Sequence, residues 1–134
     1  MKRDMMKWVD DILAAERKKG FLVLSFPAIQ KMGITVKELI ASSDLQAQAM
    51  KIVADSTPEA AAAVSMMDLS LEAEAFGSTV HFSDDEVPTV TGSIVNSEED
   101  AEALKVPEIG AGRTQIYIDA IEKSVKLIED RPVF

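Results

Sequence analysis

The residue in this sequence best placed for chemistry is an aspartate that ends an apolar run. Residues 62–67 are apolar except for one serine, and Asp68 follows them directly. An apolar run of this length is typical of a buried strand. In α/β barrels the catalytic groups lie at the carboxyl ends of the strands. The pattern therefore indicates that Asp68 is a catalytic carboxylate.

Two further polar residues are expected near the same edge. Ser25 ends a second apolar run, residues 21–24, and Glu72 follows Asp68 by one helical turn. We predict that Ser25 and Glu72 face a substrate or cofactor. Asp68 and Ser25 also have purely structural interpretations. Asp68 can cap a helix over residues 69–76, and a serine at a strand end is commonly a turn former.

The helices that position these residues are indicated by apolar spacing and by capping residues. Helices are expected after Asp4 with a stop at Gly20, over residues 34–41, from a Ser43–Gln46 capping box onward, over 69–76, after Ser97, and over about 114–129. Thr57-Pro58 is compatible with one more helix start. The last helix is expected to bury Ile118, Ile121, Val125 and Ile128.

The strand pattern alternates with these helices. Strands are expected over residues 21–25, 64–67, 79–82, 87–91 and 131–134. The third and fourth are expected to pair as a hairpin across an acidic turn, with Pro88 favouring an edge position. Alternating strands and helices predict a parallel sheet. The expected fold is therefore α/β, with a leading helix and a small β-hairpin.

The stretch around Asp68 resembles a known superfamily, the uroporphyrinogen decarboxylases and the cobamide-dependent methyltransferases that share their fold. In that superfamily an aspartate ends the second strand region, and an alanine-rich helix and a glycine follow it. The matching residues here are Asp68, Glu72, Glu74, Ala75 and Gly77. The resemblance implies a TIM-type (β/α)8 barrel, and it implies that Asp68 stabilises positive charge on a tetrapyrrole during decarboxylation.

The loop after the first strand distinguishes the two branches of the superfamily. Decarboxylases carry an arginine-rich stretch there, which grips the carboxylates of the substrate. Here residues 25–33 contain Lys31 as their one basic residue, and lysine does not replace a guanidinium fork. The resemblance therefore favours the methyltransferase branch, with uroporphyrinogen decarboxylation as the alternative.

The methyltransferase branch implies a cobamide on a partner corrinoid protein and a zinc ion that activates a thiol. The zinc ligands of that branch match nothing in this sequence. His81 is the one histidine, and there is no cysteine, so we predict no metal site within these residues. Gly110 to Arg113 resembles a phosphate loop but lacks its lysine and its preceding strand. We predict a flexible lead into the last helix.

The charge pattern excludes one class of partner. The net charge is −9, and residues 52–104 contain twelve acids and no Lys or Arg. A phosphate backbone would be repelled by this stretch, so we expect no nucleic acid partner. The stretch is either a solvated acidic face or a docking surface for a basic partner. With no long apolar run, signal peptide or cysteine, we expect a cytoplasmic protein.

The length also limits the interpretation. A complete barrel needs about 250 residues, whereas the sequence has 134. We therefore expect residues 1–134 to be the N-terminal part of a uroporphyrinogen decarboxylase-like domain. Strand edges left without neighbours would favour self-association or pairing with a complementary C-terminal half. A third possibility is a non-catalytic fragment or split subunit that acts by association.

Overall fold

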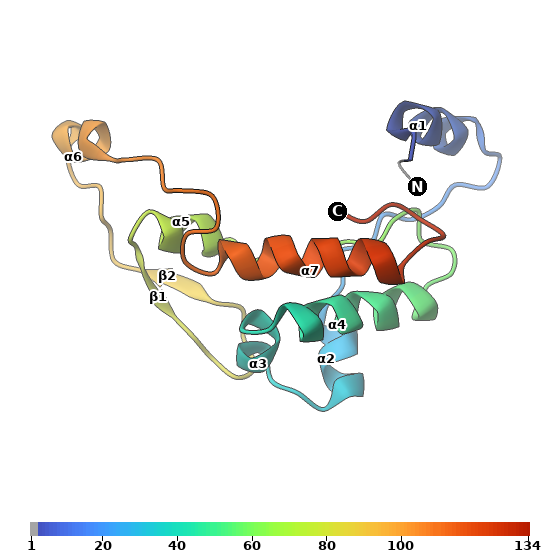
Figure 1. Cartoon of the computed structure of the whole chain (residues 1–134), viewed down its shortest axis with the longest axis horizontal. Coiled ribbons are helices and arrows are strands. Elements are labelled where there is room, and N and C mark those ends of the chain that lie inside the picture. The colour runs from blue at the N-terminus through green and yellow to red at the C-terminus, as the bar shows by residue number, and fades with distance from the viewer. Residues whose placement is uncertain (1–2) are drawn as a thin grey trace.

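The computed structural model describes residues 3–134. It is an elongated molecule with α1 near one end and α6 at the other (Figure 1). The elements in chain order are α1 Met5–Ala14, α2 Phe26–Met32, α3 Val36–Ile40, α4 Ser43–Ser56, α5 Leu71–Ala75, β1 Thr79–His81, β2 Thr89–Thr91, α6 Glu98–Ala103 and α7 Thr114–Leu127. No helix within residues 3–134 combines the length and apolar character that crossing a bilayer requires.

Three extended segments that are far apart in the sequence lie side by side in parallel. Gly20 forms a bridge with Ala60, and Ala63 forms a bridge with Val133. Backbone hydrogen bonds of 2.7 to 2.9 Å support both contacts. The segment that contains Ala60 and Ala63 is therefore the middle one, and the spatial order follows the order in the sequence. Parallel neighbours joined by helices define an α/β arrangement.

The prediction of a buried strand over residues 21–25 is wrong for this structure. No regular strand forms there, and the side chains of residues 21–24 are 36% to 53% exposed. The pairing is limited to Gly20, because residues 21–24 make no backbone hydrogen bond to the middle segment. Residues 64–67 form no strand either, and the strand predicted for residues 131–134 is reduced to an isolated bridge at Val133.

Helices α4 and α7 lie side by side and run in the same direction (Figure 1). Each of them returns the chain to the start of the next parallel segment. The contact is built on small side chains, because Ala120 and Ser124 of α7 are 1% and 0% exposed. Ser124 Oγ donates to the carbonyl of Ala120 and lies 3.2 Å from Met50 Sδ on α4.

The buried face of α7 differs from the predicted one. Tyr117, Ala120 and Ser124 are buried, while Ile118 and Val125 are 45% and 55% exposed. Of the predicted face, Ile128 is buried and Ile121 packs beside it. The helix is rotated toward its small residues because these allow close approach to α4.

Local capping signals account for several helix boundaries. Asp4 caps α1 by accepting from Lys7 N at 3.0 Å, and Ser97 caps α6 by accepting from Asp100 N at 3.1 Å. Both caps confirm the helix starts that the sequence predicted at Asp4 and Ser97. The expected stop of the first helix at Gly20 is wrong, because α1 ends at Ala14.

The start of α4 also differs from the prediction. The N-cap is Ser42, whose hydroxyl accepts from Leu45 N at 3.3 Å. Gln46 takes no part in a capping box, because its side chain is buried. Thr57-Pro58 starts no helix, and the chain leaves α4 there to become the middle extended segment.

The predicted hairpin is confirmed. β1 and β2 pair antiparallel with Thr79 opposite Thr91 and His81 opposite Thr89. Its acidic turn is attached to the helical layer, since Val36 N at the start of α3 donates to the carbonyl of Asp84 at 2.8 Å. This contact places the hairpin beside the first helices.

The main hydrophobic core lies beneath the end of the middle segment. Met66 packs on buried residues of α2, α3 and α4, namely Ala28, Ile29, Val36, Leu39, Ile40 and Ala49. The core therefore fixes the chain two residues before Asp68.

We expect Leu39→Ala to lower the free energy of unfolding by about 2–5 kcal/mol, because it opens a cavity in this core. Leu39 is 1% exposed, whereas Leu13 on α1 is 69% exposed. Leu13→Ala should change stability by less than about 0.5 kcal/mol. Urea unfolding followed by circular dichroism measures both. Equal losses for the two variants would contradict this description of the core.

Candidate functional site

The carboxylate of Asp68 is wholly buried, with a side-chain exposure of 0%. Its Oδ1 accepts from the backbone N and the Oγ of Ser70, at 3.0 and 2.6 Å. Its Oδ2 accepts from Arg113 Nη1 at 2.5 Å and from Tyr117 Oη at 2.9 Å. A carboxylate offers about four acceptor positions, so all of them are occupied.

Arg113 distributes its guanidinium over three partners. Nη1 binds Asp68, Nε donates to Glu74 Oε2 at 2.6 Å, and Nη2 donates to Ser70 Oγ at 2.9 Å. The guanidinium also lies 5.0 Å from the centre of the Phe82 ring, which adds a cation–π contact. One side chain thus connects the end of the middle segment, α5 and the end of the hairpin.

The elements that supply these groups explain their convergence. Arg113 precedes α7 and Tyr117 lies four residues later, so both project from the same side of the start of the helix. Ser70 follows Asp68 by two residues, which is the spacing at which an aspartate binds the backbone in a tight turn. Glu74 lies on α5, which begins directly after that turn.

The electrostatics of the cluster keep Asp68 ionised. Burial alone would raise the pKa of Asp68, but the hydrogen bonds from Ser70, Arg113 and Tyr117 outweigh burial and leave it below its ordinary value. Burial also opposes the charge of Arg113, yet Asp68 and Glu74 hold its pKa above the usual range. Burial and the neighbouring Asp68 charge raise the pKa of the Tyr117 hydroxyl. The cluster is a buried anion held by a cation and a neutral phenol.

The three residues predicted for the site occupy different surroundings. Ser25 is partly buried and borders a small cavity with Met66 and Gln46. Glu72 is exposed, and its side chain makes no hydrogen bond within the described part of the chain. Glu72 therefore does not join the hydrogen-bonded cluster around Asp68, because the acid of α5 that reaches Arg113 is Glu74. That Glu72 faces a substrate or cofactor stays a prediction.

The structural role of Asp68 is broader than the predicted helix cap. Its Oδ1 does bind a backbone N–H at the start of α5, that of Ser70. Its other oxygen faces α7 instead. The prediction of a flexible lead at Gly110 to Arg113 is wrong for Arg113, whose side chain is only 12% exposed.

Sequence reasoning missed Arg113 and Tyr117, although signals for both were present. Between Lys51 and Arg113 the sequence contains a single basic residue, Lys105. A buried Asp68 requires a cation partner, so the candidates were few. The four-residue spacing of Arg113 and Tyr117 at a helix start then indicates a shared face.

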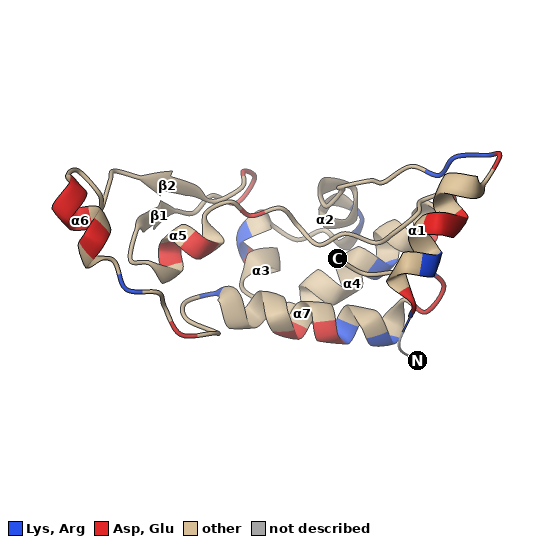
Figure 2. Ribbon diagram, turned by 90° about the horizontal axis from the view of Figure 1, so that it is seen from above, with Lys and Arg blue, Asp and Glu red and all other residues tan. Residues whose placement is uncertain are grey.

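Charged residues are distributed unevenly along the molecule. Figure 2 shows acidic residues on α5 and α6 at one end, whereas the other end carries both acidic residues on α1 and the basic residues that follow α1. These basic residues are Arg17, Lys18 and Lys19. Within residues 3–134 no three His, Cys, Asp or Glu side chains are grouped closely enough to hold a metal ion.

We expect Arg113→Met to lower the free energy of unfolding by about 3 kcal/mol, because it leaves the Asp68 carboxylate buried without its counterion. The control is Arg17→Met. Arg17 also faces a carboxylate, Glu59 at 3.7 Å, but its side chain is 82% exposed, so little change is expected. Urea unfolding of both variants tests this. A loss no larger than that of the control would contradict a stabilising role for Arg113.

The pH dependence of stability provides a separate test. Since folding lowers the pKa of Asp68, its contribution to stability is complete above the ordinary carboxyl pKa and is lost as the pH falls through the folded pKa. Asp68→Asn should therefore flatten the decline in stability between about pH 5 and about pH 2. The exposed Asp10→Asn controls for the removal of one charge. The free energy of unfolding is measured with denaturant at each pH. If it falls equally steeply toward acid pH in wild type and in Asp68→Asn, the lowered pKa of Asp68 is refuted.

Comparisons with known proteins identify the family of the chain. The family model described as uroporphyrinogen decarboxylase (URO-D) matches residues 14–134. Among solved structures, a methyltransferase from Methanosarcina mazei is similar, with a TM-score of 0.68 and 20% identity over 86% of this chain and 34% of that chain. At this identity the likeness concerns the fold alone, and the chain spans about a third of that methyltransferase. No curated protein matches the sequence. Because the family model covers most of its length, the chain belongs to the uroporphyrinogen decarboxylase family.

Proposed function

We propose that this chain contributes to cobamide-dependent methyl transfer as the first part of a TIM-type (β/α)8 barrel. The barrel is supported by the three parallel segments, which follow one another in sequence order. It is also supported by the similarity to the fold of a methyltransferase. In such a barrel the ends of these segments would form the mouth, where catalytic groups gather.

The choice of the methyltransferase branch over the decarboxylase branch rests on the position of Lys31. This lysine is the one basic residue in the loop and helix that follow the first segment, residues 25–33. Its Nζ donates to Ser56 Oγ at 2.6 Å, and Ser56 is the last residue of α4. Lys31 is thus bound at the end of α4. A substrate with many carboxylates would need bidentate cations near the mouth, which this loop does not supply.

Arg113 does not fill that gap. Its Nε, Nη1 and Nη2 already donate to Glu74, Asp68 and Ser70. Its side chain is also only 12% exposed, so little of the guanidinium is open to a substrate carboxylate. Decarboxylation of uroporphyrinogen therefore remains the alternative with less support.

In this proposal Asp68 keeps the mouth-facing role that the family resemblance implies. Arg113 and Tyr117 hold its carboxylate ionised and fixed, which is the condition for electrostatic stabilisation without reorganisation. Because its four acceptor positions are occupied, contact with a substrate requires one neutral donor, Ser70 Oγ or Tyr117 Oη, to move aside. Ser25 would face the same mouth from the end of the first segment.

The cofactors of the methyltransferase branch find no complete site here. The residues described do not fit zinc, since no three suitable ligands among them are grouped. No step on this chain is therefore assigned to zinc. The cobamide belongs, in this proposal, to a separate corrinoid protein.

Association with another chain is part of the same proposal. Phe21, Val23 and Phe134 on the outer segments are 53%, 44% and 45% exposed. The rings of Phe21 and Phe134 lie 5.6 Å apart, across a middle segment whose residues 60–63 are all alanine. An apolar surface of this kind favours a covering partner, either a complementary barrel portion or a second copy.

The test uses the protein purified in native form, with any chain that remains bound to it. One assay supplies methylcobalamin as methyl donor and an alkyl thiol as acceptor, and the other supplies uroporphyrinogen. We expect thiol methylation and no decarboxylation. Decarboxylation without methylation would replace the proposal with the alternative. Activity in neither assay would favour a non-catalytic role through association.

The contribution of Asp68 is tested in whichever assay the wild type passes. Asp68→Asn should reduce turnover by at least about 100-fold, the scale for loss of one positioned electrostatic group. Since this change also weakens the Arg113 pair, each variant is assayed below its own unfolding midpoint. Asp10→Asn, at an exposed position on α1, serves as control. Near-normal turnover of folded Asp68→Asn would leave Asp68 with a structural role only.

A further inference from the structure

Among residues 3–134, Gln46 is the one residue whose buried side-chain polar atoms lack a hydrogen-bond partner. Gln46 is 3% exposed, and neither its Oε1 nor its Nε2 has a hydrogen-bond partner among residues 3–134. Buried polar groups are nearly always paired with protein or with ordered water, because leaving them unpaired is costly. An amide with both atoms unpaired therefore calls for a partner other than these residues.

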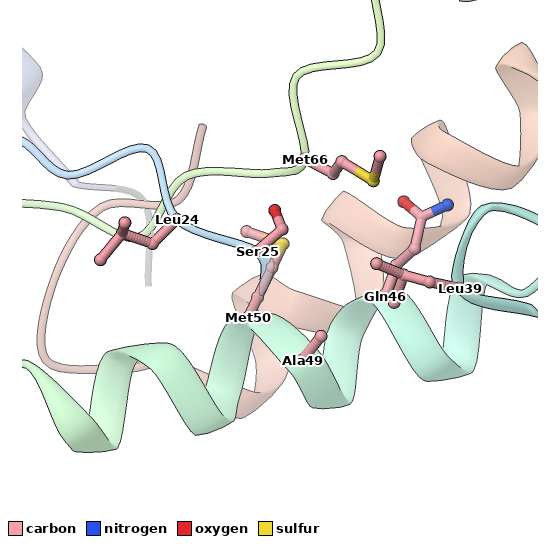
Figure 3. Close-up of a pocket in the computed structure, with 7 residues that line it drawn as sticks. All are labelled: Leu24, Ser25, Leu39, Gln46, Ala49, Met50 and Met66. Carbon is pink, nitrogen blue, oxygen red and sulfur yellow. The ribbon is translucent and has the colours of Figure 1, made fainter. Parts of the chain in front are cut away.

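The amide borders a small cavity at the end of the first extended segment. The cavity has a volume of about 10 Å³, and Ser25, Gln46 and Met66 are among the residues that line it. Figure 3 shows the Ser25 hydroxyl and the Gln46 amide on the side of α4 that faces Met66. The remaining lining residues are apolar, namely Leu24, Leu39, Ala49 and Met50.

We propose that this cavity binds a single water molecule held by the Gln46 amide and the Ser25 hydroxyl. The volume is close to that of one water-sized sphere, so a larger group is excluded. A buried water needs two to four polar partners. Gln46 offers an acceptor and a donor, and the Ser25 hydroxyl offers a third group. Apolar cavities stay dry, but this one carries three polar atoms.

The water would have a structural consequence for the candidate site. Ser25 precedes α2, and its hydroxyl makes no capping hydrogen bond to that helix. A bridging water would connect it to Gln46 on α4 instead. Bridging waters are nearly as favourable in enthalpy as direct hydrogen bonds. The end of the first segment would thereby be tied to the helical layer. This inference does not depend on the proposed methyl transfer.

Water–protein NMR on the whole chain tests the proposal. A water that remains in the cavity should give cross-peaks to the Gln46 side-chain amide hydrogens with the sign that reports slow tumbling. The matched control is Gln48, which is exposed on the same helix and should show only the signature of fast surface water. Ser25→Ala removes one of the three partners, so it should weaken the Gln46 cross-peaks and leave those of Gln48 unchanged.

A crystal structure of the chain gives an independent readout. We expect a solvent density peak within hydrogen-bonding distance of both the Gln46 amide and Ser25 Oγ. A folded chain in which the Gln46 amide shows no slow-water cross-peak, or a cavity without such density, would overturn the proposal. The same holds if the density shows Gln46 bonded directly to a protein group.

Discussion

The structure depends most on one buried charge and its neutralisation. Asp68 has no exposed side-chain surface, and its charge is balanced by Arg113 at 2.5 Å. A buried carboxylate is tolerated only when paired and fully hydrogen-bonded, and Ser70 and Tyr117 complete that requirement. Asp68 and Ser70 lie in the turn before α5, whereas Arg113 and Tyr117 lie at the start of α7. The ion pair therefore fixes how the half of the chain that ends at this turn meets the half that contains α7.

The buried alanines of the middle segment are a second constraint on the fold. Ala60, Ala61, Ala62 and Ala63 are all buried. Small side chains in the middle of three parallel segments allow the helices to approach on one side, where Ala63 packs with Met50 and Ile128. On the outer segments the rings of Phe21 and Phe134 meet. All three parallel segments lie within residues 14–134, the part of the chain that the family model matches.

Features set by neighbours in the sequence could be predicted. Asp4 and Ser97 cap helices because a short polar side chain needs only the next turn of backbone, and the hairpin follows from alternation on either side of a turn. Asp68 could also be singled out from the sequence, since an acid that ends an apolar run stands out without a structure. Whether it is catalytic stays a proposal.

Features set by distant contacts could not be predicted in the same way. The face of α7 is selected by contact with α4, so helical spacing alone indicated Ile118 and Val125 in place of Ala120 and Ser124. Residues 21–25 have strand composition, but they lack the neighbours that would complete and bury a strand. Gln46 matched a capping motif by spacing, yet the rotation of α4 turned its amide inward. Arg113 lies 45 residues from Asp68, beyond the reach of any local pattern.

A double-mutant cycle at Asp68 and Arg113 tests the central claim most directly. The free energy of unfolding is measured for wild type, Asp68→Asn, Arg113→Met and the double variant. If the buried ion pair joins the two halves, the double variant should lose less than the sum of the single losses by at least about 1.5 kcal/mol, within the range for residues in direct contact. Additive losses would show that the two side chains act independently and would contradict the account.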